Sequence, residues 1–182
     1  SEQIGSSTAW AAGYTCAGSK IAIIDTGIDI DHQSFSAAGY DHSMELLAKD
    51  AGMTLDAYKK SVGVLDAAGI ADVFSQLNIA KSTTVSAVTR NDKIPFAYNY
   101  VDKNTKITHM DDEQGEHGSH VAGIAAANKY IANADGTFSN ALETAKVQGV
   151  APDAQLVVMK VFGNAGGAYD SDYMAAIEDA IV

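Results

Sequence analysis

Two histidines, His117 and His120, lie three positions apart between an acidic run and a stretch of small residues. An imidazole can act as a general base near neutral pH, because an unperturbed histidine has a pKa of about 6.5. A carboxylate on the far ring nitrogen would fix the tautomer and stabilise the imidazolium. The sequence offers Asp25, which ends the apolar run 20–25. These residue types could therefore form a proton relay.

Asp25 also stands where a ligand site is expected. It closes a predicted parallel strand, and open α/β sheets bind their ligands at the carboxyl ends of the strands. The alternative is a carboxylate that only caps a helix or holds the turn at "TG". Both interpretations stay open for this residue taken alone.

A shared metal ion is the competing interpretation of the two histidines. Positions three apart on a helix are separated by roughly 60°, so His117 and His120 could face one ion of a metal-dependent hydrolase. Catalytic zinc usually takes three protein ligands, however, and the chain lacks the two-histidine motif with an intervening glutamate. Cys16 is its single cysteine. For His120 we favour a hydrogen-bonded side chain packed under the sheet, and we predict no metal site.

Two other segments could bind ions. Asp111, Asp112, Glu113 and Glu116 could hold calcium, but acids before a helix usually form a solvated start that the helix dipole favours. The glycine-rich segment 163–170 could cradle a phosphate, yet it lacks the lysine and the spacing of a P-loop. We therefore predict an extended loop there.

Apolar runs define the strands. Residues 20–25 and 154–162 are typical of strands buried on both faces of a parallel sheet, and 94–102 predicts a further strand. Helices predicted at 117–128 and 171–182 alternate with these strands. The pattern indicates an α/β fold, a three-layer sandwich with a mainly parallel sheet and helices on both faces.

The remaining segments are predicted as follows. Residues 7–13 form a short helix, residues 129–148 form a surface loop, and residues 36–90 form a helical insertion. Within the insertion the expected helix caps are Ser43 and Thr54, and one apolar face is shared at helical spacing (Ile70, Val73, Phe74 and Leu77). The last helix has a predicted cap at Ser171 or Asp170.

Length and charge bound the function classes. The 182 residues fit one domain, and a net charge of −11 argues against nucleic acid as a partner. A single cysteine excludes an intrachain disulfide. The longest apolar stretches are far too short to insert across a membrane.

Three segments occur together and in order: "AIIDTGIDIDH" at 22–32, "HGSHVAGIAAA" at 117–127 and "GVAPDAQLVVMKVF" at 149–162. Together they resemble the subtilases, the subtilisin-like serine peptidases. The long separation of Asp25 from His117, with "KIPFAYNYVD" between them, is similar to the lactocepin-type cell-envelope proteinases of Gram-positive bacteria. The resemblance implies an extracellular or cell-wall location in a bacterium.

The resemblance also assigns roles. It implies that Asp25 and His117 are the aspartate and histidine of an Asp/His/Ser triad, and that protein or peptide is the substrate. It implies that one loop borders the substrate groove and pairs with the peptide backbone (Gly166, Gly167, Ala168 and Tyr169). It implies no certain cofactor; calcium could bind in the complete enzyme. Ser34 stands where small relatives carry a calcium-binding aspartate.

The family's nucleophile block, "GTSMA", and its oxyanion asparagine are missing from these residues. We therefore expect residues 1–182 to be the N-terminal portion of a catalytic domain, inactive alone. In the family's sheet order, strand 20–25 would then lie at an open edge, through which the fragment would dimerise or aggregate. A catalytically inactive cell-surface binding module of the same fold is the alternative.

Overall fold

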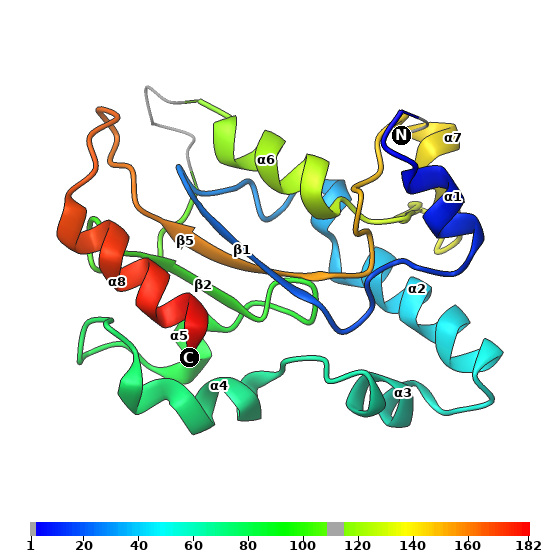
Figure 1. The fold of residues 1–182 in the computed structure, drawn as a ribbon, viewed down its shortest axis with the longest axis horizontal. Coiled ribbons are helices and arrows are strands. Elements are labelled where there is room, and N and C mark those ends of the chain that lie inside the picture. Colours follow the sequence, from blue (N-terminus) through cyan, green and yellow to red (C-terminus); the bar gives the residue numbers. More distant parts are fainter. Residues whose placement is uncertain (1–2, 109–114) are drawn as a thin grey trace.

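The computed structural model describes residues 3–108 and 115–182. A three-stranded parallel sheet forms its centre (Figure 1). The strand order is β1 (Lys20–Asp25), β5 (Gln155–Lys160), β2 (Phe96–Asn99), and β5 pairs in parallel with both neighbours. The predicted strands and the predicted α/β class with a mainly parallel sheet are confirmed.

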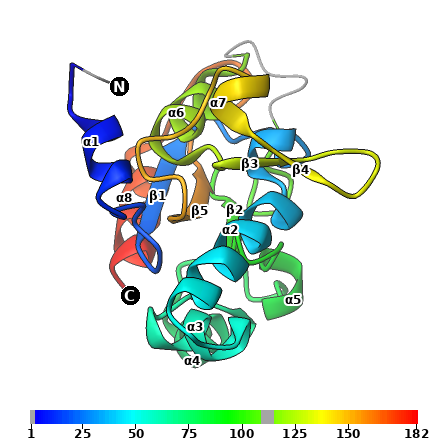
Figure 2. The same cartoon turned by 90° about the vertical axis from the view of Figure 1, so that its right-hand side faces the viewer.

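Helices cover both faces of this sheet, as predicted. Helix α6 (His117–Ala126) packs on one face through Gly118, Ala122 and Ala126, whose small side chains allow a close approach. Helix α8 (Asp170–Ile181) and helix α4 (Ala67–Val73) contribute to the apolar cluster on the other face. In Figures 1 and 2 the sheet lies between α6 on one side and α3 and α4 on the other.

Strand β1 is an edge strand, since its only partner among the described residues is β5. Its place at the edge agrees with the expectation from the family's sheet order. The predicted burial on both faces is only partly right, because Lys20 and Ala22 are exposed while Ile23 and Asp25 are buried. An edge strand leaves part of its surface uncovered whenever no further element packs beside it.

The segment between β1 and β2 is helical, as predicted, in short pieces. After η1 (Gln33–Phe35) it consists of four helices and a further 3₁₀ turn: α2 (Ala37–Asp50), α3 (Leu55–Ser61), α4, η2 (Phe74–Gln76) and α5 (Val85–Val88). Ile70, Phe74 and Leu77 join the apolar cluster beneath the sheet, as their spacing predicted.

One of the two predicted caps in this segment is wrong. Thr54 caps α3, because its Oγ1 accepts a hydrogen bond from the Ala57 amide at 3.3 Å. Ser43 lies buried inside α2, and Ser36 caps that helix by accepting from the Gly39 amide at 3.2 Å. The helix therefore begins about two turns closer to the N-terminus than the sequence pattern indicated, at 3.6 residues per turn.

Residues 129–148 are not the surface loop that the sequence predicted. Strands β3 (Tyr130–Ala132) and β4 (Phe138–Asn140) form an antiparallel hairpin, followed by α7 (Ala141–Thr144). The turn contains an Asp-Gly pair, a common hairpin signal, with Gly136 at a φ of 81°. Phe138 stacks on His42 of α2 with ring centroids 4.0 Å apart, which ties the hairpin to that helix.

Both chain ends carry helices. Helix α1 (Ser6–Ala11) confirms the predicted short helix, while α8 begins at Asp170 without a side-chain cap, so the predicted cap at Ser171 or Asp170 is wrong. Cys16, on the turn that leads into β1, has a φ of 66°, a left-handed conformation that favours glycine. Within the described residues, no helix has the length and apolarity that crossing a bilayer requires.

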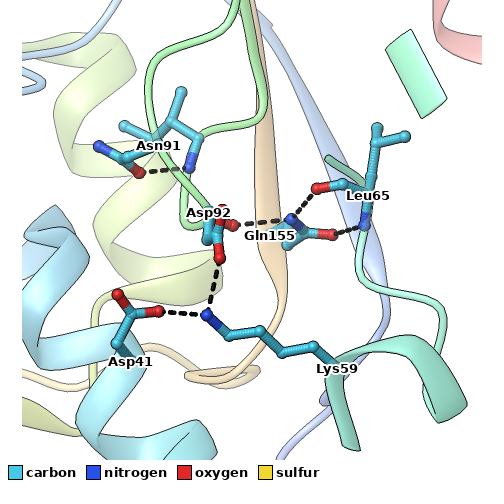
Figure 3. Close-up of polar contacts among 7 residues, drawn as sticks. Asp41, Lys59, Leu65, Asn91, Asp92 and Gln155 are labelled. Atoms are coloured by element: carbon cyan, nitrogen blue, oxygen red, sulfur yellow. Dashed lines mark hydrogen bonds and ion pairs between the residues drawn. The ribbon is translucent and has the colours of Figure 1, made fainter. Parts of the chain in front are cut away.

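A polar network fastens the helical segment to the amino end of the sheet (Figure 3). Gln155, fully buried as the first residue of β5, accepts from the Leu65 amide at 2.7 Å and donates to the carbonyls of Leu65 and Asp92. Lys59 reaches the carboxylates of Asp41 and Asp92, both at 2.7 Å. Partial burial lowers the pKa of Lys59, but these two carboxylates outweigh it and raise the pKa overall.

The network predicts unequal costs for its two side chains. Gln155→Leu leaves three backbone groups without their partner and is expected to lower the free energy of unfolding by about 2–4 kcal/mol. Lys59→Met removes ion pairs to half-exposed carboxylates and should cost about 1 kcal/mol or less. Urea unfolding followed by circular dichroism measures both, and equal losses would contradict this account.

Lys93 predicts a dependence of stability on pH. It is fully buried and donates to the carbonyls of Pro152 and Ala154; burial lowers its pKa to about 7, while the Asp153 carboxylate opposes that effect. In the unfolded chain its pKa is about 10.4, so between these values the unfolded state binds more protons. The free energy of unfolding should therefore rise as the pH increases from about 7 to about 10.

Lys93→Met is the matched control for this pH dependence. The variant has no titratable group at the position and should lack the rise. Urea unfolding of both proteins across that pH range compares the two slopes, and identical slopes would show that Lys93 is not the cause.

Candidate active site

Asp25 and His117 meet at the carboxyl end of the sheet. Nδ1 of His117 lies 2.8 Å from Oδ1 and 3.1 Å from Oδ2 of Asp25. The carboxylate is nearly buried, whereas the imidazole is 66% exposed. With Nδ1 protonated, the ring donates to the carboxylate and presents Nε2 as the acceptor. The structure thus brings together the two residues that the sequence selected for a proton relay.

Backbone geometry brings these two side chains together. The Thr26 amide donates to Oδ1 of Asp25 at 2.7 Å, and the Thr26 hydroxyl accepts from the Gly118 amide at 3.0 Å. The first contact holds the carboxylate within its own turn, while the second, next to the contact between Asp25 and His117, joins that turn to the first turn of α6. A Cβ on Gly118 would lie 2.0 Å from the Gly27 carbonyl oxygen, so only glycine allows this approach.

Ser119 strengthens the same junction. Its Oγ accepts a hydrogen bond from the Asp29 amide at 2.9 Å, which ties the loop after β1 to α6. The hydroxyl is thus used in positioning the loop. Ser171, which the sequence predicts only as a possible helix cap, is exposed on α8.

The prediction that His120 packs under the sheet is wrong. Its side chain is exposed and lines an open groove with residues of α1, η1 and α7. The small buried residues of α6 face the sheet, and His120 lies on the other side of the helix. Among residues 3–108 and 115–182, no group of three or more His, Cys, Asp or Glu side chains could hold a metal ion.

The acidic run is only partly described. Asp111, Asp112 and Glu113 lie outside the described residues, and Glu116 is exposed directly before α6. Ser34 is buried, with its carbonyl accepting from the Asn128 amide at 2.8 Å. A serine hydroxyl is a weaker ligand for calcium than the carboxylate that the sequence comparison led us to look for, so Ser34 does not fit a calcium site.

The predicted substrate loop follows β5. Gly166 has a φ of 80°, and the Gly163 amide donates to the Gly167 carbonyl at 2.9 Å, which closes a tight turn. Gly167, Ala168 and Tyr169 are exposed. Lys160, where β5 ends, pairs with Asp25 in the parallel register, so the loop starts at the same end of the sheet as the Asp25–His117 pair.

Two residues of this site were missed in the sequence. The sequence pattern places Thr26 in a turn and Lys160 in an apolar strand, and it predicts a role in the site for neither. The structure buries both and links the Lys160 ammonium to the Thr26 carbonyl at 2.7 Å. A lone charged residue at the end of a buried strand was the available signal, since such residues are rarely buried without a partner.

Comparison with known proteins gives the following relatives. A PI-type proteinase of Lactococcus lactis subsp. cremoris is 32% identical over 92% of this chain, and the minor extracellular protease Vpr of Bacillus subtilis is 29% identical over 98%. A C5a peptidase of Streptococcus pyogenes is 27% identical over 91%. The chain spans 7%, 14% and 11% of the lengths of these proteins.

The proteinases of lactic acid bacteria agree with the lactocepin-type resemblance drawn from the sequence motifs. The profile of the subtilase family matches residues 17–181, which include both members of the hydrogen-bonded pair and the whole parallel sheet. This chain belongs to the subtilase family.

Proposed function

We propose that this chain supplies the aspartate and the histidine of a serine endopeptidase that hydrolyses proteins or peptides. The observation that carries the proposal is the 2.8 Å contact between Nδ1 of His117 and Oδ1 of Asp25. Family membership and the protease names of the relatives support a peptidase of the serine type.

The geometry supports a defined role for each group. Asp25 holds the tautomer in which Nδ1 of His117 is protonated and stabilises the imidazolium that forms during catalysis. Nε2 then accepts the proton of the nucleophilic hydroxyl as that oxygen attacks the peptide carbonyl. The same nitrogen returns the proton to the leaving amine. The exposed imidazole is accessible for both transfers.

The nucleophile is proposed to come from outside these 182 residues. The serine block and oxyanion asparagine of the family are missing from the sequence, and Ser119 accepts a hydrogen bond from the Asp29 amide. Acyl transfer requires serine, base and oxyanion donors together. On this proposal the 182 residues alone are inactive and form the N-terminal portion of a catalytic domain, with residues 36–90 as an insertion.

Substrate and location complete the proposal. Gly166, Gly167, Ala168 and Tyr169 would pair with the backbone of an extended peptide, as an added strand does. Their exposure and their position after β5 support this role. An extracellular or cell-wall location in a bacterium is proposed by analogy with a relative that is named an extracellular protease.

The test of the relay uses a peptidase-competent protein that contains these residues. His117→Ala removes the base, and Asp25→Asn disturbs the tautomer, so each should lower kcat by about 10⁴-fold or more. His120→Ala is the matched control, because this exposed histidine lies one helical turn away, and its kcat should stay within about twofold. Peptide hydrolysis rates decide the matter. Equal losses for His117→Ala and His120→Ala would instead favour the metal hydrolase.

We also propose that the 182-residue chain associates through the free edge of β1. Ala22 is exposed on this strand, and unpaired backbone groups of an edge invite a second strand. Ala22→Lys should weaken the association, because lysines on edges oppose pairing. Ala68→Lys, on the exposed surface of α4, is the control. Sedimentation velocity over a wide concentration range measures both, and a monomer at all concentrations would refute the proposal.

A further inference from the structure

The last residues of the three strands form a polar row on the α6 face of the sheet. Asp25, Lys160 and Asn99 are partners in the parallel register. The row two residues earlier is apolar and buried in the cluster that includes α6 (Ile23, Val158, Ala97). Side chains two positions apart point to the same face of a strand, so the polar row continues the apolar one toward the site.

Lys160 is the central member of this row and is 1% exposed. Burial of an ammonium is costly unless hydrogen bonds compensate it. Its Nζ donates to the Thr26 carbonyl at 2.7 Å, so this hydrogen bond joins the end of β5 to the turn that follows β1. The side chain of Lys160 is therefore buried, with its Nζ directed at the residue that follows Asp25.

Thr26 links Lys160 to the proposed relay, because its three polar groups contact Asp25, α6 and Lys160. Its amide donates to Oδ1 of Asp25, its hydroxyl accepts from the Gly118 amide, and its carbonyl accepts from Lys160. The residue is 2% exposed. The turn is thereby held by Lys160 of β5 and by Gly118 of α6.

The lysine stem also packs against this turn. A Cβ added to Gly27 would lie 3.4 Å from Cδ of Lys160 and 2.0 Å from the Ile107 carbonyl oxygen. Gly27 has a φ of 97°, so the chain turns sharply between these neighbours. Removing the ammonium would leave the Thr26 carbonyl buried without this donor and free the turn to reorient.

We propose that Lys160 is a positioning residue of the relay: its ammonium fixes the Thr26 carbonyl, so that the Thr26 amide keeps the Asp25 carboxylate aligned with Nδ1 of His117. The inference rests on the proposed function, because it concerns the same relay. Lys160 acts through Thr26 and does not itself exchange a proton.

The test reads the His117 ring in the 182-residue protein, where no nucleophile is required. Two-bond ¹H–¹⁵N correlation spectra of protein with labelled histidine report which ring nitrogen is protonated, and Asp25→Ala gives the shifts of a ring without its acceptor. Lys160→Met should move the His117 shifts toward the Asp25→Ala values. Lys160→Arg, which keeps a cationic donor, should retain the wild-type shifts.

Lys93→Met is the matched control. Lys93 is equally buried and also donates to backbone carbonyls, but it lies near the amino end of β5, away from the relay. Its variant should keep the wild-type shifts of His117. All spectra are recorded where circular dichroism shows each variant folded. Wild-type shifts in Lys160→Met would overturn the proposal, as would equal changes in Lys93→Met or Lys160→Arg.

Kinetics separates this inference from the proposed function. In a peptidase-competent protein, Lys160→Met should lower kcat by about 10²-fold with little change in KM, since misplacement of a catalytic group by about 1 Å costs that much. If Lys160→Met moves the His117 shifts but His117→Ala leaves peptide hydrolysis intact, the positioning role stands and the proposed function fails. If His117→Ala abolishes hydrolysis and Lys160→Met leaves kcat intact, the positioning role fails.

Discussion

The hydrogen bond between Asp25 and His117 constrains how closely α6 must pack on the sheet. Its two side chains come from segments far apart in the sequence, one at the end of a strand and the other at the start of a helix. A contact of 2.8 Å between such segments requires the helix to approach the sheet closely. The small residues of α6, above all Gly118 against the Gly27 carbonyl, permit that approach.

The parts of the fold that the sequence predicted are those with a strong local signal. The apolar runs of β1 and β5 identified both strands, and the rule that ligand sites lie at the carboxyl ends of parallel strands selected Asp25. His117 followed from its place at the start of a helix rich in glycine and alanine. Recognition of the family motifs pointed to the same pair.

The features that were missed depend on tertiary contacts. His120 was expected to be buried, but helix rotation relative to the sheet decides which side of α6 is covered. Strands β3 and β4 are only three residues long, so the sequence shows no apolar run there. The hairpin is held instead by its packing against His42 of α2. Lys160 donates to the carbonyl of Thr26, which follows a different strand, and sequence spacing does not reveal such a contact.

Gln155 and Lys160 mark the two ends of β5, about 16 Å apart along the strand at roughly 3.3 Å per residue. One end anchors the long helical segment, and the other holds the turn that follows Asp25. The β-strand thus separates the anchor of the helical segment from the turn that follows Asp25. A substitution or insertion in the anchored segment therefore acts at the end of β5 that lies away from the hydrogen bond between Asp25 and His117.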